Sequence, residues 1–197
     1  MQFFWNFVTD FGDSAVTLPL AAATIAFLFL SGWSRAALAL ALALAGCGIA
    51  IGLLKLGLES CGHPLLHTDI TNPSGHAAIS TTVYGALALL FGHRLPAGRR
   101  WFPVVGAFIL VSGIAVSRVV LDAHSLPEVA IGLSIGLTAV AVFARALAGL
   151  PAPAFRGLWL AIIVIAVMAA MHGSRWPLEQ IVHAIVHWIR HGVPRCA

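Results

Sequence analysis

Six apolar runs separated by short polar breaks constrain the fold of this sequence more than any other feature. The runs span residues 15–30, 36–54, 77–91, 104–116, 129–144 and 158–171. Each is near or slightly below the roughly 20 residues that a helix needs to cross a bilayer, and each can extend into its flanks. Within a bilayer, a helix satisfies its own backbone hydrogen bonds. We therefore predict an all-α, polytopic membrane protein built as a six-helix transmembrane bundle.

The composition indicates one membrane-embedded domain over residues 1–197. Hydrophobic residues make up 60% of the chain and charged residues 9%, whereas a typical soluble domain is roughly 25% charged. The 11 Lys and Arg residues outnumber the 7 Asp and Glu residues, but they are scattered singly. Scattered cations do not make a basic patch, so we expect no nucleic-acid partner. Small residues in the runs, such as Gly113 and Gly132, let membrane helices approach closely and predict a compact bundle.

The polar breaks alternate in character along the chain. Arginines gather in residues 31–35, 93–100 and 145–156, whereas residues 55–73 and 117–125 hold few cations and most of the His, Asp and Ser. Cytoplasmic loops of membrane proteins carry an excess of Lys and Arg. We therefore expect the arginine-bearing breaks in the cytoplasm, and the two polar breaks and both termini outside. Three arginines near the C-terminus count against this orientation.

Both ends of the chain are predicted to lie along the membrane interface. In the tail, residues 174–197, a helix would place Ile181 and Ile185 on one face and His183 and His187 on the other. Histidines four apart can bind a metal, but no Cys or carboxylate completes a set, so we expect a solvated polar face. The N-terminal aromatic residues predict an interfacial anchor, and without a basic stretch or a cleavage site we expect no removable signal peptide. These aromatic residues are Phe3, Phe4, Trp5 and Phe7.

The first of three polar clusters begins with Lys55, at the end of the second apolar run. Glu59, His63 and His67 follow it. An ionisable residue at such a position is costly unless it is paired or solvated in a cavity, which makes Lys55 a functional candidate. The alternative is a lysine that extends its ammonium group to the lipid headgroups. The residues alone leave both interpretations open.

The second cluster, residues 72–76, reads Asn-Pro-Ser-Gly-His and immediately precedes the third run. With Asn72 as N-cap and Pro next, the first backbone N–H groups of the helix would point outward with the positive end of its dipole. Such a helix start can bind an anion. Gly75 allows close approach of a phosphate, Ser74 offers a hydroxyl, and His76 can exchange a proton near neutral pH. An ordinary capped helix start is the alternative, but it does not explain His76.

The third cluster joins Arg118 to His124, six residues later, and to Glu128, four residues further on. A guanidinium can hold phosphate oxygens bidentately, and a neutral imidazole can attack phosphorus when a carboxylate holds its other nitrogen. Glu128 is the candidate carboxylate, although it also completes a capping box that begins at Ser125. Both roles can hold together. Asp122 is a second candidate for orienting His124.

With these clusters in this order, the chain resembles the type 2 phosphatidic acid phosphatase superfamily, which includes membrane lipid phosphatases and soluble vanadium haloperoxidases. The family pattern is Lys-x6-Arg-Pro, then Pro-Ser-Gly-His, then Ser-Arg-x5-His-x3-Asp. Residues 73–76 match the second element in full, and Ser117, Arg118 and His124 match the third at the family spacing. The resemblance covers residues 55–128.

Two positions depart from the family pattern. Lys55 matches the start of the first element, but Gly62 stands where the family has arginine, and the nearest basic residue before a proline is His63. Glu128 replaces the final aspartate and keeps its charge on a longer side chain. The smaller set of cations bears on phosphate affinity rather than on the type of reaction.

The resemblance implies a role for each site residue. His124 is the nucleophile that becomes phosphorylated, His76 is the general acid for the leaving group, and Glu128 orients His124. The expected phosphate-binding residues are Lys55, Ser74, Gly75 and Arg118. Because these cations and the helix N-terminus can neutralise the developing charge, we expect neither a metal nor another cofactor.

The resulting hypothesis is an integral membrane phosphatase that hydrolyses a phosphomonoester or diphosphate on a lipid, with its site on the periplasmic or outer side of a bacterial inner membrane. Undecaprenyl diphosphate, phosphatidate and similar lipid phosphates all fit as substrates. A lipid phosphotransferase would use the same phosphohistidine. A transporter with an ionisable pathway would instead distribute its charges across the bilayer depth, and here the charges collect on one side.

Overall fold

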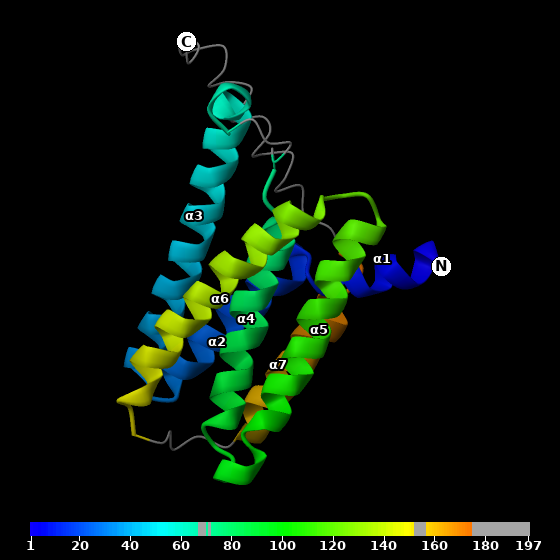
Figure 1. Ribbon diagram of the computed structural model, residues 1–197. Coiled ribbons are helices and arrows are strands. Elements are labelled where there is room, and N and C mark those ends of the chain that lie inside the picture. The colour runs from blue at the N-terminus through cyan, green and yellow to red at the C-terminus, as the bar shows by residue number, and fades with distance from the viewer. Residues whose placement is uncertain (67–69, 71, 152–156, 175–197) are drawn as a thin grey trace.

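The computed structural model describes residues 1–66, 70, 72–151 and 157–174, and within them every regular element is a helix (Figure 1). The α-helices are α1 (Gln2–Asp10), α2 (Ser14–Leu30), α3 (Ser34–Leu66), α4 (Gly75–Gly92), α5 (Trp101–Val120), α6 (Leu126–Ala148) and α7 (Gly157–Met171), with a short 3-10 helix, η1 (Ala97–Arg99), before α5. Each predicted apolar run lies within one of α2 to α7. The predicted all-α, six-helix membrane bundle is therefore confirmed, and α1 precedes it as an additional short helix.

Five stretches of the described chain are long and apolar enough to cross a membrane. They are Gln2–Leu30, Ser34–Leu58, Gly75–Gly92, Ala97–Val120 and Leu126–Ala148. The sixth helix, α7, has 15 apolar residues, or about 22 Å of helix, and residues 152–156 and 175–197 on its flanks lie outside the described part. The chain is an integral membrane protein. The predicted interfacial helix of the tail falls almost wholly on these undescribed residues.

Helix α4 forms the centre of the bundle, and Figure 1 shows it among α2, α5 and α6. In its most apolar stretch 67% of the residues are buried, against 39% or less in the other four spans. The hydroxyl groups of Ser80, Thr81 and Thr82 are buried there, and each donates a hydrogen bond to a carbonyl one turn earlier in the same helix. A central helix can therefore carry polar side chains without exposing them to lipid.

Two glycines bring α6 against α4. A Cβ atom at Gly132 would overlap the carbonyl oxygen of Ser74, and one at Gly136 would lie 2.5 Å from Ala78 O and 2.6 Å from Thr81 Cβ. Neither contact leaves room for a methyl group. The predicted close packing through small residues is thus present at this interface, and it fixes α6 against the first turn of α4.

Gly132→Ala is expected to destabilise the protein by about 1–3 kcal/mol, because the added methyl group must push α6 away from α4. Thermal unfolding of the purified protein in detergent measures this change. Gly48→Ala is the matched control, since a Cβ atom at Gly48 has no neighbour within 4 Å. An equal loss of stability in both variants would contradict close packing at Gly132.

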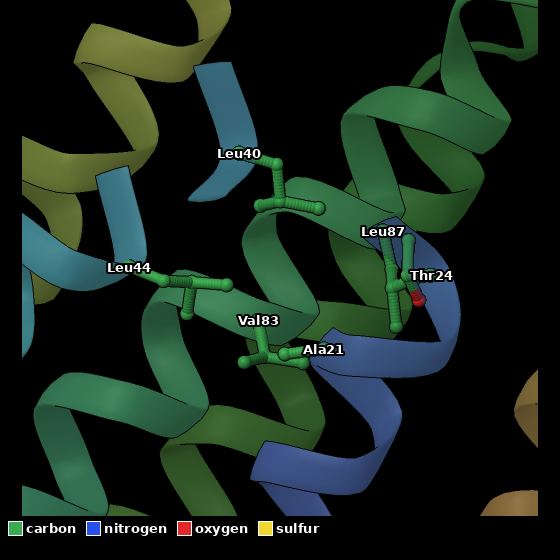
Figure 2. Close-up of a pocket in the computed structure, with 6 residues that line it drawn as sticks. All are labelled: Ala21, Thr24, Leu40, Leu44, Val83 and Leu87. Atoms are coloured by element: carbon green, nitrogen blue, oxygen red, sulfur yellow. The ribbon is translucent and has the colours of Figure 1, made fainter. Parts of the chain in front are cut away.

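A small crevice among α2, α3 and α4 is apolar rather than a candidate site. Figure 2 shows its lining side chains, which come from these three helices. The lining residues are Ala21, Thr24, Leu40, Leu44, Val83 and Leu87. Thr24 carries the one hydroxyl among them, and this hydroxyl donates a hydrogen bond to Leu20 O of the same helix at 2.7 Å. The crevice is a seam of helix packing.

The two kinds of polar break lie at opposite ends of the bundle. In Figure 1 the α2–α3 connection, which adjoins Arg35, and the α4–α5 connection, which contains three arginines, lie at the lower end of the bundle. The α5–α6 turn and the start of α4 lie at the upper end. Helix α1 lies across the bundle beside the upper part of α5. The N-terminal segment therefore shares an end with the two polar breaks, as the sequence predicts.

Candidate active site

The three predicted clusters converge at one end of the bundle. The site uses the C-terminal half of α3, the N-terminus of α4, the C-terminus of α5 and the N-terminus of α6. Helices that alternate in direction bring alternate ends together, so residues far apart in the sequence meet here.

A tight turn between α5 and α6 brings His124 back to Arg118. The backbone N–H groups of Ala123 and His124 both donate to Arg118 O, at 3.0 and 3.2 Å. Asp122 adopts a left-handed conformation with φ of 52°, which Asp tolerates better than most residues. The turn therefore fixes the backbone of His124 beside the backbone of Arg118, six residues earlier. It also leaves the His124 side chain only 2% exposed.

Glu128 combines both of the roles predicted for it. Ser125 and Glu128 form a capping box, in which Ser125 N donates to Glu128 Oε2 at 3.0 Å. The same oxygen lies 3.5 Å from His124 Nδ1, and Asn72 N donates to the other carboxylate oxygen at 2.7 Å. The two hydrogen bonds from backbone N–H groups fix the position of the buried carboxylate beside the imidazole. Asp122, the other candidate carboxylate, is exposed on the turn.

The start of α4 differs from the prediction that Asn72 is the N-cap and residue 73 the first helical residue. That prediction is wrong, because the helix begins at Gly75 and Ser74 is its N-cap, with Ala77 N donating to Ser74 Oγ at 3.4 Å. The backbone N–H of Asn72 instead donates to the Glu128 carboxylate, and Ser74 N donates to Glu128 O at 3.1 Å. These cross-links hold the segment extended, which delays the helix start by two residues.

The helix N-terminus keeps the features of an anion site. Gly75 is now its first residue, and the closest neighbour of a Cβ atom there would be Ile51 Cγ2 at 3.9 Å, so open space surrounds this position. As N-cap, Ser74 Oγ accepts a hydrogen bond and its own hydrogen can still donate. The first backbone N–H groups of α4 carry the positive end of the helix dipole.

Lys55 belongs to the same end of the bundle. It lies one helical turn after Ile51 on α3, so the two side chains share a face. Ile51 is the residue nearest to the open space at Gly75, and both Ile51 and Lys55 are only 5% exposed. The lysine is therefore buried toward α4 rather than extended to the headgroups. The side chains of Glu59, His63 and His67 lie outside the described part.

Two partners of the site were not predicted from the sequence. His76 Nε2 lies 3.5 Å from Asp13 Oδ2, and Arg118 Nη1 donates to Thr9 Oγ1 at 3.3 Å. Asp13 precedes the first apolar run, which is a recognisable N-cap signal, and it does cap α2 by accepting from Ala15 N at 2.8 Å. Nothing in the local sequence indicates a contact with a residue 63 positions away.

This arrangement provides the parts of a phosphate-transfer site. Two cations, Lys55 and Arg118, accompany a helix N-terminus, and two histidines each lie beside a carboxylate. Among the described residues, no group of three or more His, Cys, Asp or Glu side chains is arranged to hold a metal. The two cations and the helix N-terminus could together bind an anion, and the two histidines could exchange protons with it.

Comparison with known proteins agrees with this geometry. The family model of the PAP2 superfamily matches residues 36–152, which include every predicted site residue but neither Thr9 nor Asp13. The chain is also 33% identical over 140 residues to an uncharacterized 22.5 kDa protein in the cps region of Klebsiella pneumoniae, an alignment that covers 71% of this chain and 67% of that protein. No solved structure matches. The chain therefore belongs to the PAP2 superfamily, whose phosphatases act on phosphorylated lipids in membranes.

Proposed function

We propose that this protein hydrolyses a phosphomonoester or diphosphate bond on a lipid through a phosphohistidine intermediate on His124. The observation that carries this proposal is the His124 Nδ1 to Glu128 Oε2 distance of 3.5 Å, at the N-terminus of α6 and within the family-matched residues. A carboxylate at Nδ1 favours the tautomer with its proton on that nitrogen, so the lone pair of Nε2 is the nucleophile.

The first step forms the phosphoenzyme. His124 Nε2 attacks phosphorus, an N–P bond forms, and the P–O bond to the lipid breaks. The oxygen of the leaving group takes a proton from His76, which is then neutral. Glu128 stabilises the positive charge that develops on the His124 imidazole, and its two backbone hydrogen bonds keep it in place while this happens.

The second step releases phosphate. A water molecule gives a proton to His76 and attacks phosphorus, the N–P bond breaks, and inorganic phosphate leaves. Both histidines return to their starting protonation states. The sum of the two steps is hydrolysis of one phosphate bond on the lipid, with no net change in the enzyme.

Charge on the transferring phosphoryl group is stabilised by groups of this chain. Lys55, Arg118, the Ser74 hydroxyl and the N–H groups that begin α4 would surround the phosphoryl oxygens. Because Lys55 and Ser74 are buried, the electrostatic attraction is screened less than it would be in water. This scheme uses no metal and no other cofactor.

The substrate phosphate is expected at the end of the bundle that lies away from the arginine-bearing connections, which the positive-inside rule assigns to the periplasmic or outer side. A relative in Klebsiella pneumoniae and a helical rather than barrel architecture support the inner membrane of a bacterium. Undecaprenyl diphosphate, phosphatidate and related lipids present a phosphate at the membrane surface.

A panel of lipid phosphates tests the function. Purified protein in detergent with EDTA should release inorganic phosphate from at least one of undecaprenyl diphosphate, phosphatidate and phosphatidylglycerol phosphate. Vanadate, which adopts a five-coordinate geometry like the transferring phosphoryl group, should inhibit it. Transfer of the phosphate to a second lipid, without release of inorganic phosphate, would indicate a phosphotransferase. A strict requirement for magnesium would contradict the scheme.

Single cysteines test the orientation of the bundle. In a background without Cys47, Cys61 and Cys196, Ala123→Cys in the α5–α6 turn should react with an impermeant maleimide added to intact cells from which the outer membrane barrier has been removed. Ala97→Cys should react only after lysis. Both positions are exposed, so their labelling reports on the side of the membrane, and the reverse pattern would place the site in the cytoplasm.

A further inference from the structure

We propose that the N-terminal segment, residues 9–13, completes the active site: Asp13 positions His76 for proton transfer, and Thr9 positions Arg118 for phosphate binding. This inference rests on the proposed function. The segment precedes the residues that match the family model, yet it supplies a polar partner to one member of each matched motif.

Asp13 is held in place by its own helix. One carboxylate oxygen, Oδ1, accepts from Ala15 N at 2.8 Å and caps α2, while Oδ2 lies 3.5 Å from His76 Nε2. The side chains of His76 and Asp13 are only 15% and 14% exposed, so solvent screens this pair less than an ion pair on the surface. Capping fixes the carboxylate, and the fixed carboxylate orients the imidazole.

The two histidines thereby have the same kind of support. Glu128 caps α6 and contacts His124, and Asp13 caps α2 and contacts His76. The nitrogen contacted differs: Glu128 faces Nδ1 of His124, whereas Asp13 faces Nε2 of His76. With the Nε2 proton of His76 directed at Asp13, the proton that His76 gives to the leaving group is the one on Nδ1.

Thr9 acts on the other motif. It is the one buried residue of α1, and its hydroxyl accepts from Arg118 Nη1 at 3.3 Å. A guanidinium has five N–H donors in a fixed fork, so one bond to Thr9 can hold its plane while other donors bind phosphate oxygens. Arg118 lies in the last turn of α5, and fixing so long a side chain restricts its rotamers.

Contacts with α4 and α5, and a contact of the preceding α1 with the residue after α7, hold the segment in place. Tyr84 on α4 donates its hydroxyl to Phe11 O at 2.7 Å, and His172 Nε2, just after α7, lies 3.1 Å from Phe7 O. A Cβ atom at Gly12 would lie 2.6 Å from Ile114 Cγ2 on α5, so glycine permits the close approach. The segment is therefore anchored beside the site by contacts of its own.

Asp13→Asn tests the first half of the proposal, because asparagine caps a helix about as well as aspartate but carries no charge. The kcat/KM is measured for two substrates in the same sample: a short-chain alkyl phosphate, whose alkoxide needs a proton to leave, and 4-nitrophenyl phosphate, whose phenolate does not. The ratio of the two values does not depend on the fraction of folded protein. We expect the alkyl to aryl ratio to fall by about tenfold or more, since a general acid contributes at least that much.

His76→Ala and the double variant show whether Asp13 acts through His76. Asp13→Asn should cause no further fall of the ratio in the His76→Ala background, because residues that act as a unit are not additive. Asp122→Asn is the matched control: it removes a carboxylate that is exposed on the α5–α6 turn, and asparagine tolerates the same left-handed conformation. Its ratio should equal that of the wild type.

Thr9→Val tests the second half with a different signature. Valine keeps the shape of the buried side chain and removes only the hydroxyl. We expect vanadate to inhibit this variant about fivefold more weakly or worse, as for the loss of a hydrogen bond to a charged group, with the alkyl to aryl ratio unchanged. Unchanged vanadate inhibition would overturn the role of Thr9.

The outcomes separate this inference from the proposed function. If the wild type hydrolyses both substrates and Asp13→Asn leaves their ratio unchanged, or lowers both rates equally, Asp13 does not position the general acid and the inference is wrong while the function stands. If the wild type releases no phosphate from any lipid phosphate or aryl phosphate, the proposed function is wrong and the inference fails with it.

Discussion

Replacing His124 with alanine is expected to reduce phosphate release from a lipid phosphate to the background level while the protein stays folded. The imidazole is the one group that the proposed mechanism bonds to phosphorus, and removing the nucleophile of a covalent mechanism costs on the order of 10⁴-fold or more. Glu128 keeps its bonds to Asn72 N and Ser125 N in this variant, so the α6 cap survives. The measurement is turnover, alongside thermal unfolding in detergent.

His93→Ala is the matched control for this loss. His93 lies after the last residue of α4, at the arginine-bearing end of the bundle, where its ring packs against Trp33 at a centroid distance of 5.8 Å. The variant removes a half-buried imidazole away from the site, and its activity should stay near that of the wild type. Retention of more than about one hundredth of the activity in His124→Ala would remove His124 from the role of nucleophile.

Glu128→Gln is expected to lower turnover by orders of magnitude, because glutamine cannot stabilise the positive imidazole as a carboxylate does. The structure adds a cost in stability. Each carboxylate oxygen accepts a hydrogen bond from a backbone N–H, one from Asn72 and one from Ser125. The amide oxygen of glutamine can accept one of these bonds, but its nitrogen is a donor and cannot accept the other. The free energy of unfolding should therefore fall by about 1–3 kcal/mol as well.

Ser125→Ala separates these two effects. It removes the other half of the capping box and should cost about 1 kcal/mol of stability, but it leaves the Glu128 carboxylate beside His124. We expect nearly normal turnover in Ser125→Ala and strongly reduced turnover in Glu128→Gln. Glu128→Asp restores the residue of the family pattern and should keep much of the activity. Comparable turnover in Ser125→Ala and Glu128→Gln would reject the orienting role of Glu128.

Much of the fold could be predicted because the bilayer restricts the chain to helices of limited length. Each apolar run lies within a helix, and the observed helices extend beyond the runs by only a few residues except in α3, which continues to Leu66. The apolar pattern did not predict this extension of α3, because residues 55–66 include too many polar residues to read as part of a membrane-spanning run. Figure 1 shows this part of α3 projecting beyond the rest of the bundle.

The candidate site was predictable where its contacts are local. Ser125 and Glu128 are three positions apart, and Glu128 and His124 are four apart, so one helical turn fixes both contacts. The start of α4 was placed two residues too early, because the bonds from the backbone of Asn72 and Ser74 to Glu128 cross 56 and 54 positions of sequence. Thr9 and Asp13 were missed for the same reason, since their partners lie on α5 and α4.

The central claim is a covalent bond between phosphorus and His124, and trapping that intermediate tests it most directly. Protein mixed with a ³²P-labelled lipid phosphate is quenched in denaturant within the first turnover, digested and mapped. We predict label on the peptide that contains His124, labile in acid and stable in base as expected of a phosphoramidate, and no label in His124→Ala. Label on another residue, or a complete single turnover without any covalently bound label, would contradict the mechanism.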